Sequence, residues 1–114
     1  MDCLFCEIAN KNIPSDIVYE DDRIIAFRDI TPQAPEHILI IPKKHFDSLD
    51  DLDNSEETKE LLGYLMLKVK EIASSAGINN GYRLVNNCGE DGQQTVKHVH
   101  FHLLGKRKLN WPPG

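Results

Sequence analysis

The segment His98-Val99-His100-Phe101-His102-Leu103-Leu104 alternates three of the chain's five histidines with apolar residues. Successive side chains of an extended strand point to opposite faces. The alternation therefore predicts a strand with the histidines on one face and the apolar residues packed in a core on the other. An imidazole has a pKa of about 6.5 and is mostly neutral at pH 7, where it can act as a nucleophile or bind a metal. The segment thus predicts both a core strand and a place for chemistry.

Length and composition indicate the general class of protein. The 114 residues, 40% of them hydrophobic, are enough for one domain over residues 1–114 with a modest core. A net charge of −5 argues against nucleic acid and anionic membranes as partners. No apolar run is long enough for a signal peptide or a membrane span, and three cysteines are an odd number for a disulfide framework. We therefore expect a cytoplasmic protein with reduced thiols.

Short apolar runs separated by turn residues predict the strands of an α+β fold. The acidic turn Glu20-Asp21-Asp22 lies between two such runs and indicates a β-hairpin. Residues 31–36 contain two prolines and should form a loop, and Pro42 should end the next strand because it cannot donate to a ladder. The predicted strands cover residues 17–19, 23–28, 37–41, 82–85 and 98–104.

Two helices are expected as well. A short N-terminal helix is indicated by apolar residues at helical spacing between Leu4 and Ala9. A long amphipathic helix is indicated by the spacing of Leu61, Leu62, Leu65, Met66, Val69, Ile72 and Ala73. Asn54 followed by Glu57 is typical of a capping box, and Gly77 should mark the end of this helix.

From its residues alone, the histidine segment has three interpretations. It could be an ordinary strand whose polar face happens to carry histidines. It could present two imidazoles to zinc, with a third ligand from elsewhere in the chain. It could also hold a histidine nucleophile, which needs no strong base but does need a neighbouring acceptor to fix its ring orientation and tautomer.

Motifs spread over nearly the whole chain narrow this choice. The pattern His-x-His-x-His-x-x with apolar intervening residues resembles the histidine triad superfamily, and within it the branch of small nucleoside phosphoramidate hydrolases. That resemblance implies a histidine-triad fold with a five-stranded antiparallel sheet, one long helix and a short N-terminal helix. The similarity rests on the order and spacing of residues 19–22, 27–35, 37, 41–45, 81–83, 98–104 and 111–114.

The resemblance implies roles for four histidines. The middle one of the row, His100, would attack the α-phosphorus of a nucleoside 5′-phosphoramidate and form a nucleotidyl-histidine that water then hydrolyses. His102 would donate to the phosphate, and His98 would support the site from the other side. His37 would orient the nucleophile from behind or hold a proton.

Substrate contacts follow from the same resemblance. The residues expected at the phosphate are Asn87, Gln93 and Thr95, although relatives commonly have glycine where this chain has Gln93. Asp29 would accept hydrogen bonds from the ribose hydroxyls. A purine base would lie in an apolar slot formed by Phe5, Ile8, Phe27 and Leu39, residues that on local pattern alone read as core.

A pair of cysteines, Cys3 and Cys6, opens the chain and could grip one zinc ion. The resemblance to zinc-containing histidine triad proteins supplies His45 and His98 as the other two ligands of a structural site, so zinc is the expected cofactor. It would not be needed for the chemical step. Two other interpretations of the pair are a redox-active dithiol and two incidental buried thiols.

Three functions therefore remain open. The first is a nucleotide phosphoramidate hydrolase acting through His100. The second is a nucleotide-binding or interaction module with little physiological hydrolysis. The third is a zinc hydrolase that uses the histidine row as metal ligands. The resemblance also implies a symmetric homodimer formed by the long helix and the strand at residues 82–85, with the Trp111 tail reaching toward the partner's active site.

Overall fold

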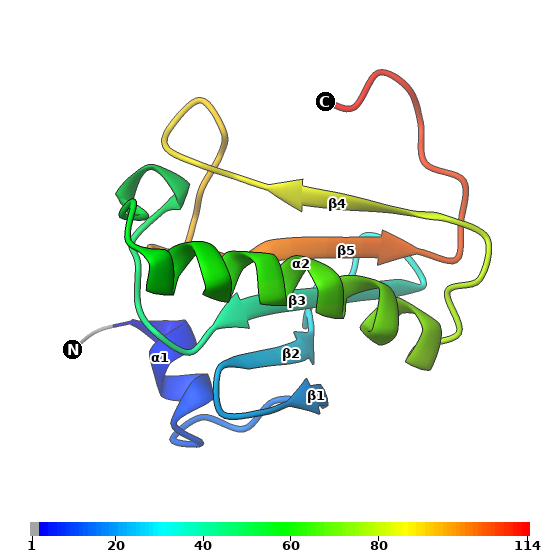
Figure 1. The fold of residues 1–114 in the computed structure, drawn as a ribbon. Helices are drawn as coiled ribbons and strands as arrows, with labels where there is room; N and C mark the ends of the chain where they lie inside the picture. Colours follow the sequence, from blue (N-terminus) through cyan, green and yellow to red (C-terminus); the bar gives the residue numbers. More distant parts are fainter. Residues whose placement is uncertain (1–2) are drawn as a thin grey trace.

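The computed structural model describes residues 3–114 and contains a five-stranded antiparallel sheet with a helix on each face (Figure 1). The elements in chain order are α1 (Leu4–Ala9), β1 (Ile17–Glu20), β2 (Ile24–Arg28), β3 (Glu36–Pro42), the short η1 turn (Leu49–Asp51), α2 (Glu56–Ser75), β4 (Tyr82–Asn86) and β5 (Phe101–Gly105). The strand order is β1-β2-β3-β5-β4. The predicted α+β class, with five strands, one long helix and a short N-terminal helix, is confirmed.

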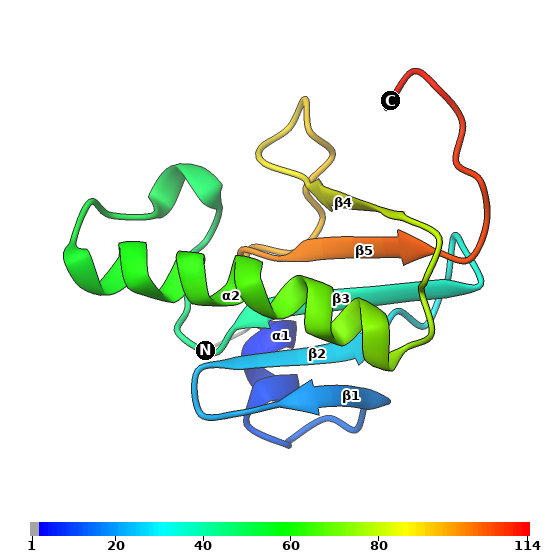
Figure 2. The ribbon, with the colours of Figure 1, turned by 45° about the vertical axis from the view of Figure 1, so that its right-hand side comes forward.

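The central strands β2 and β3 are buried on both faces because α1 and α2 lie on opposite sides of the sheet (Figure 2). Side chains alternate between the two faces, so each strand contributes to two cores. On the α2 side these residues are Ile24, Ala26, Ile38 and Ile40. On the α1 side they are Ile25, Phe27, Leu39 and Ile41. Continuous apolar runs are what a strand buried on both faces requires.

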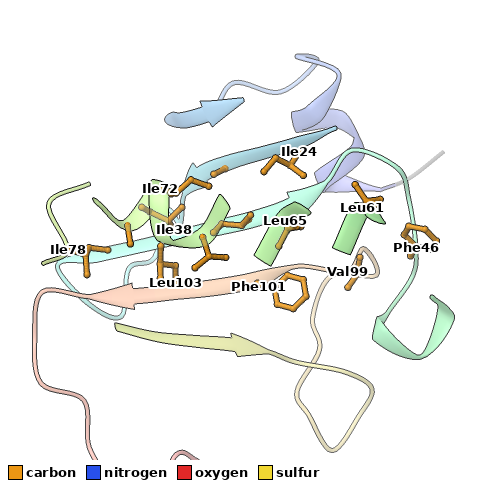
Figure 3. Close-up of a cluster of buried hydrophobic side chains, with 14 residues drawn as sticks. Ile24, Ile38, Phe46, Leu61, Leu65, Ile72, Ile78, Val99, Phe101 and Leu103 are labelled. Carbon is orange, nitrogen blue, oxygen red and sulfur yellow. The ribbon is translucent and has the colours of Figure 1, made fainter. Parts of the chain in front are cut away.

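The larger core lies between α2 and the sheet (Figure 3). Leu65 of α2 is fully buried, and Leu103 of β5 is fully buried opposite it. Burying one such side chain stabilises the fold by roughly 1.5–3 kcal/mol. This packing holds β5 in its place between β3 and β4, and β5 contains the last part of the histidine segment.

The start of α2 differs from the prediction. The N-cap is Ser55, whose Oγ accepts a hydrogen bond from the backbone N–H of Thr58 at 3.1 Å, so Asn54 and Glu57 do not form a capping box. Asp53 accepts hydrogen bonds from the N–H and hydroxyl of Ser55, which holds the cap one residue later than expected. The other end agrees with the prediction, since Gly77 follows the helix with a left-handed φ of +76°.

The histidine strand also begins later than predicted, at Phe101, so His98 and His100 precede β5. The register pairs Ile40 with Phe101, and its continuation would set Val99 opposite Pro42, which has no backbone N–H to donate. Val99 instead donates its N–H to the carbonyl of Phe46 at 2.7 Å. The predicted alternation of faces nevertheless holds, because Val99 and Phe101 pack in the α2-side core while the His98 and His100 rings contact Phe5.

Exposed apolar groups lie on β4 and on α2. β4 is an edge strand, and Tyr82 on it is 45% exposed. Met66 and Leu67 of α2 are 41% and 63% exposed. The tail after β5 runs beyond the β4 edge and carries the exposed Trp111 (Figure 1). Within residues 3–114, every helix is too short or too polar to span a bilayer.

Candidate active site and metal centre

A cavity of about 300 Å³ lies on the α1 side of the sheet. Its wall includes eight of the residues expected to hold or attack a nucleotide: Phe5, Ile8, Phe27, Asp29, Leu39, Thr95, His100 and His102. The apolar groups come from α1, β2 and β3, whereas His100 directly precedes β5 and His102 lies within it. The volume is at the lower end of the range for small-molecule sites.

The aromatic residue Phe5 joins the apolar part of the cavity to the histidines. Its ring packs edge-on against Phe27, with centroids 5.4 Å apart. It packs in the same way against His100, with centroids 5.0 Å apart and an interplanar angle of 87°. The short helix α1 therefore forms one wall of the cavity and restricts the orientation of the central imidazole.

The tautomer of His100 follows from its hydrogen bonding. Its Nδ1–H donates to the carbonyl oxygen of His98 at 2.7 Å, and the residue is only 3% exposed. A neutral imidazole carries one proton, so Nε2 retains its lone pair. Because His100 lines the cavity, this arrangement is what a nucleophilic histidine needs.

The tautomer of His102 is determined by a chain of contacts behind it. The backbone N–H of Gln33 donates to Nδ1 of His37 at 3.0 Å, so the proton of His37 must be on Nε2. That Nε2–H donates to Nδ1 of His102 at 2.9 Å. Nδ1 of His102 is thus an acceptor, so the single N–H proton of this neutral ring is on Nε2, which can act as a hydrogen-bond donor.

Burial keeps these two histidines neutral. Desolvation, together with the nearby His100 and His37 rings, lowers the pKa of His102 to about 4. Desolvation also lowers the pKa of His37, and the carboxylate of Asp29 opposes that change only in part. Both rings are therefore uncharged at neutral pH, and the tautomers above apply.

At the edge of the cavity, Asp29 retains acceptor capacity. Its Oδ1 accepts the backbone N–H of Thr31 at 2.8 Å, and its Oδ2 lies 3.5 Å from Nε2 of His37. The side chain is 20% exposed and lines the cavity. A carboxylate has about four lone-pair sites, so Asp29 can still accept from a bound ligand.

The loop at residues 87–97 agrees only in part with the expected phosphate contacts. Thr95 lines the cavity, whereas Asn87 and Gln93 do not. The amide of Asn87 instead donates to the carbonyl of Gly92 at 2.6 Å and closes the loop. Gln93 has a φ of +60°, the left-handed conformation that a glycine adopts more easily.

The expected metal ligands Cys3, Cys6, His45 and His98 converge on one point. Cys3 Sγ and His98 Nδ1 are 3.3 Å apart, as are Cys6 Sγ and His45 Nδ1. The two Nδ1 atoms of His45 and His98 are 3.1 Å apart. Ligands of one tetrahedral zinc ion lie roughly 3.3–3.8 Å from one another, given bond lengths of about 2.0–2.3 Å. The cluster therefore could hold a zinc ion.

Surrounding hydrogen bonds prepare three of these four ligand atoms for a metal. Nε2–H of His98 donates to the carbonyl of Pro42 at 2.8 Å, and Nε2–H of His45 donates to Asp47 at 2.6 Å. Both Nδ1 lone pairs are thereby left free to bind a cation. The backbone N–H of Cys6 donates to the sulfur of Cys3 at 3.3 Å. These contacts fit a structural zinc site better than a redox pair.

The histidine row does not form a second metal site by itself. His98 belongs to the cysteine cluster, and His102 lies in a group with Asp29 and His37. In the described part of the chain, His100 belongs to neither group. Nε2 of His37 carries a proton and cannot bind a metal while the ring is neutral. This argues against a zinc hydrolase that uses the row as ligands.

Several groups that shape the site were not recognised from the sequence. The carbonyls of His98 and Pro42 and the N–H of Gln33 set histidine tautomers, and backbone groups carry no residue-specific signal. Asp47, two residues after the expected ligand His45, could have been found as an orienting carboxylate. Gln94 donates to the carbonyl of Asp47 at 2.6 Å and joins the metal centre to the loop.

Comparison with known proteins agrees with this geometry. The model of the HIT domain matches residues 10–109. The 14 kDa zinc-binding protein of Zea mays is 54% identical over 97% of this chain and 87% of its own length. The HIT family hydrolase of Legionella pneumophila superposes with a TM-score of 0.93 at 49% identity, over 99% of this chain and 100% of that one.

A more distant structure has the same fold. The histidine triad nucleotide-binding protein of Candida albicans superposes with a TM-score of 0.84 at 32% identity, over 99% of this chain and 85% of that one. Together with the family match, which covers most of the sequence, these similarities show that the chain belongs to the HIT domain family and is a HIT hydrolase-like protein.

Proposed function

We propose that this protein hydrolyses nucleoside 5′-phosphoramidates, such as adenosine 5′-phosphoramidate, through a nucleotidyl-histidine on His100. The observation that carries the proposal is the 2.7 Å hydrogen bond from Nδ1–H of His100 to the carbonyl of His98. It leaves an unprotonated Nε2 at the wall of a cavity that is also lined by apolar side chains and by the carboxylate of Asp29. This combination suits a purine nucleoside whose α-phosphorus lies at the histidines.

In the first step, Nε2 of His100 attacks phosphorus and the phosphorus–nitrogen bond to the leaving amine breaks. The electron pair of that bond passes to the amine, which takes up a proton from solvent water. Water then hydrolyses the nucleotidyl-histidine, releasing the nucleoside monophosphate and regenerating His100. Nε2–H of His102 would donate to a non-bridging phosphoryl oxygen in both steps. Such a donor stabilises the charge on the phosphoryl oxygens.

Substrate recognition would involve the other cavity residues. Asp29 would accept from the ribose hydroxyls, and Phe5, Ile8, Phe27 and Leu39 would enclose the base. Thr95 would approach the phosphate directly. Asn87 and Gln93 would act through the shape of their loop. An apolar slot recognises a purine by shape and stacking, so we expect weak discrimination between adenine and guanine.

The test is incubation with adenosine 5′-phosphoramidate, with the His100→Ala variant as control. Release of AMP by the wild type alone is expected, with a phosphorus–nitrogen adduct on His100 found by mass spectrometry after an acid-free quench. A wild type that binds AMP but releases none from the substrate would favour the alternative, a nucleotide-binding or interaction module.

We infer that Cys3, Cys6, His45 and His98 bind a structural zinc ion in the cell. The zinc would tie α1, the segment after β3 and the segment before β5 together, and would not take part in the chemical step. The spacing of the ligand atoms and the name of the maize relative support this. Structural zinc can contribute on the order of 10 kcal/mol to folding a small domain.

We also propose that residues 1–114 act as a single domain that forms a cytoplasmic homodimer. The exposed apolar residues Met66 and Leu67 on α2 and the unpaired edge of β4 support pairing of two copies through this surface. A Leu67→Glu variant should then be monomeric in analytical ultracentrifugation. An unchanged dimer in that variant would argue for a different interface.

A further inference from the structure

The tail after β5 contacts the loop that precedes β3. Nε and Nη2 of Arg107 donate to the carbonyl oxygen of Gln33 at 3.2 and 3.0 Å. Nη1 of the same guanidinium donates to the carbonyl of Lys108 at 3.2 Å, which holds the side chain in place. Arg107 does not line the nucleotide cavity and is not a metal ligand.

The residue that Arg107 holds is the start of the hydrogen-bond chain that ends at His102. The N–H of Gln33 donates to Nδ1 of His37 at 3.0 Å. His37 in turn donates from Nε2 to Nδ1 of His102 at 2.9 Å. Each link requires the one before it, because a neutral imidazole that accepts at one nitrogen must donate from the other.

We propose that Arg107 is a positioning residue, which holds Gln33 so that His37 and His102 both carry their proton on Nε2. The inference rests on the proposed function for its catalytic consequence. In the opposite tautomer, Nε2 of His102 would present a lone pair to a phosphoryl oxygen and would repel it. The tautomer therefore decides whether His102 stabilises or opposes the charge that develops at phosphorus.

Other contacts hold this loop only partly. Its two prolines restrict φ, the N–H of Thr31 donates to Asp29 at 2.8 Å, and the amide of Gln33 donates to the carbonyl of Thr31 at 3.0 Å. These contacts are local to residues 29–35. Among the hydrogen bonds of the described residues, those of Arg107 alone join Gln33 to a distant part of the chain. The two N–H groups that a planar guanidinium donates fix a carbonyl oxygen more firmly than the single ammonium group of a lysine would.

The experiment compares wild type with R107A, R107K and R83A. Arg83 is the matched control because it also holds the tail, through Nη2 to the carbonyl of Asn110 at 2.8 Å, and does not contact Gln33. The ring nitrogens of His37 and His102 are observed by long-range proton–nitrogen NMR at pH 8 on the zinc-loaded protein. We expect both rings in the Nε2–H form in wild type and R83A, mixed tautomers in R107A, and a smaller change in R107K.

Turnover of adenosine 5′-phosphoramidate gives a second readout. The R107A substitution should reduce transition-state stabilisation by about the free energy of one hydrogen bond. We therefore expect kcat of R107A to fall about fivefold, whereas KM should change less than about twofold. Unchanged tautomers in R107A, or an equal change in R83A, would overturn the proposal. A wild type that turns over no substrate but whose tautomers depend on Arg107 would refute the hydrolase function and leave the positioning role standing. If R107A does not fold, the same tautomer and turnover measurements on R107K test the proposal.

Discussion

The low pKa of His102 predicts a measurable loss of stability in mild acid. The unfolded residue titrates near pH 6.5, whereas the folded one titrates near pH 4 because of burial and the neighbouring His100 and His37 rings. Between these values the unfolded chain binds a proton that the folded protein does not. The contribution of His102 to the free energy of unfolding is therefore fully present above about pH 6.5 and is lost as the pH decreases toward 4.

The size of the effect follows from that window. Each pH unit over which one extra proton binds to the unfolded state costs about 1.36 kcal/mol. A window of about 2.5 pH units gives an upper limit of roughly 3.4 kcal/mol. Because His102 is partly exposed and solvent screens its interactions, we expect about 2 kcal/mol.

The assay compares urea unfolding of wild type and His102→Gln between pH 7.5 and pH 4.5. Glutamine does not titrate, and its amide oxygen can still accept the Nε2–H of His37. Acid loss of zinc and protonation of the other histidines affect both proteins, so they cancel in the difference. The wild type should lose about 2 kcal/mol more than the variant on acidification. Equal losses in the two proteins would refute the reasoning.

Three further predictions concern other parts of the structure. In Gly105→Ala, the new Cβ would lie 2.6 Å from Cγ2 of Ile78, so thermal unfolding should show that the free energy of unfolding is lower by about 1–3 kcal/mol. An unchanged Tm would mean that this contact relaxes freely. In Asp47→Ala, the hydrogen bond that orients His45 is lost, so competition with a chelator should show zinc affinity reduced about 10- to 100-fold; equal affinity would exclude an orienting role. In Asp29→Asn, KM for a ribonucleoside substrate should rise about tenfold but not for its 2′,3′-dideoxy analogue, and equal effects on both would place the ribose elsewhere.

Much of the architecture is visible in local patterns. The spacing of apolar residues such as Leu61, Leu65 and Val69 predicts α2, because a helix turns every 3.6 residues regardless of what it packs against. The all-apolar run in β3 predicts burial on both faces. The exceptions lie at element ends, where one alternative donor or acceptor is enough to move a boundary. The N-cap of α2 is Ser55 and not the predicted Asn54. β5 begins later than predicted because the continued register would set Val99 opposite Pro42, which has no N–H to donate.

In the candidate site, too, the sequence predicts some features and the others depend on the tertiary structure. The residue types at the three histidines and the two cysteines indicated nucleophilic or metal chemistry, because side-chain chemistry is a property of the residue itself. The nucleotide, the role of Asp29 and the other two zinc ligands came from the resemblance to the histidine triad family. What each histidine can do with its proton depends on backbone groups from distant segments. His98 and His100 are two residues apart, yet the carbonyl of Pro42 leaves the Nδ1 lone pair of His98 facing the two cysteine sulfurs, and the carbonyl of His98 leaves the Nε2 lone pair of His100 free. A tautomer is set by the acceptor that folding brings within about 3 Å, and sequence spacing does not specify that acceptor.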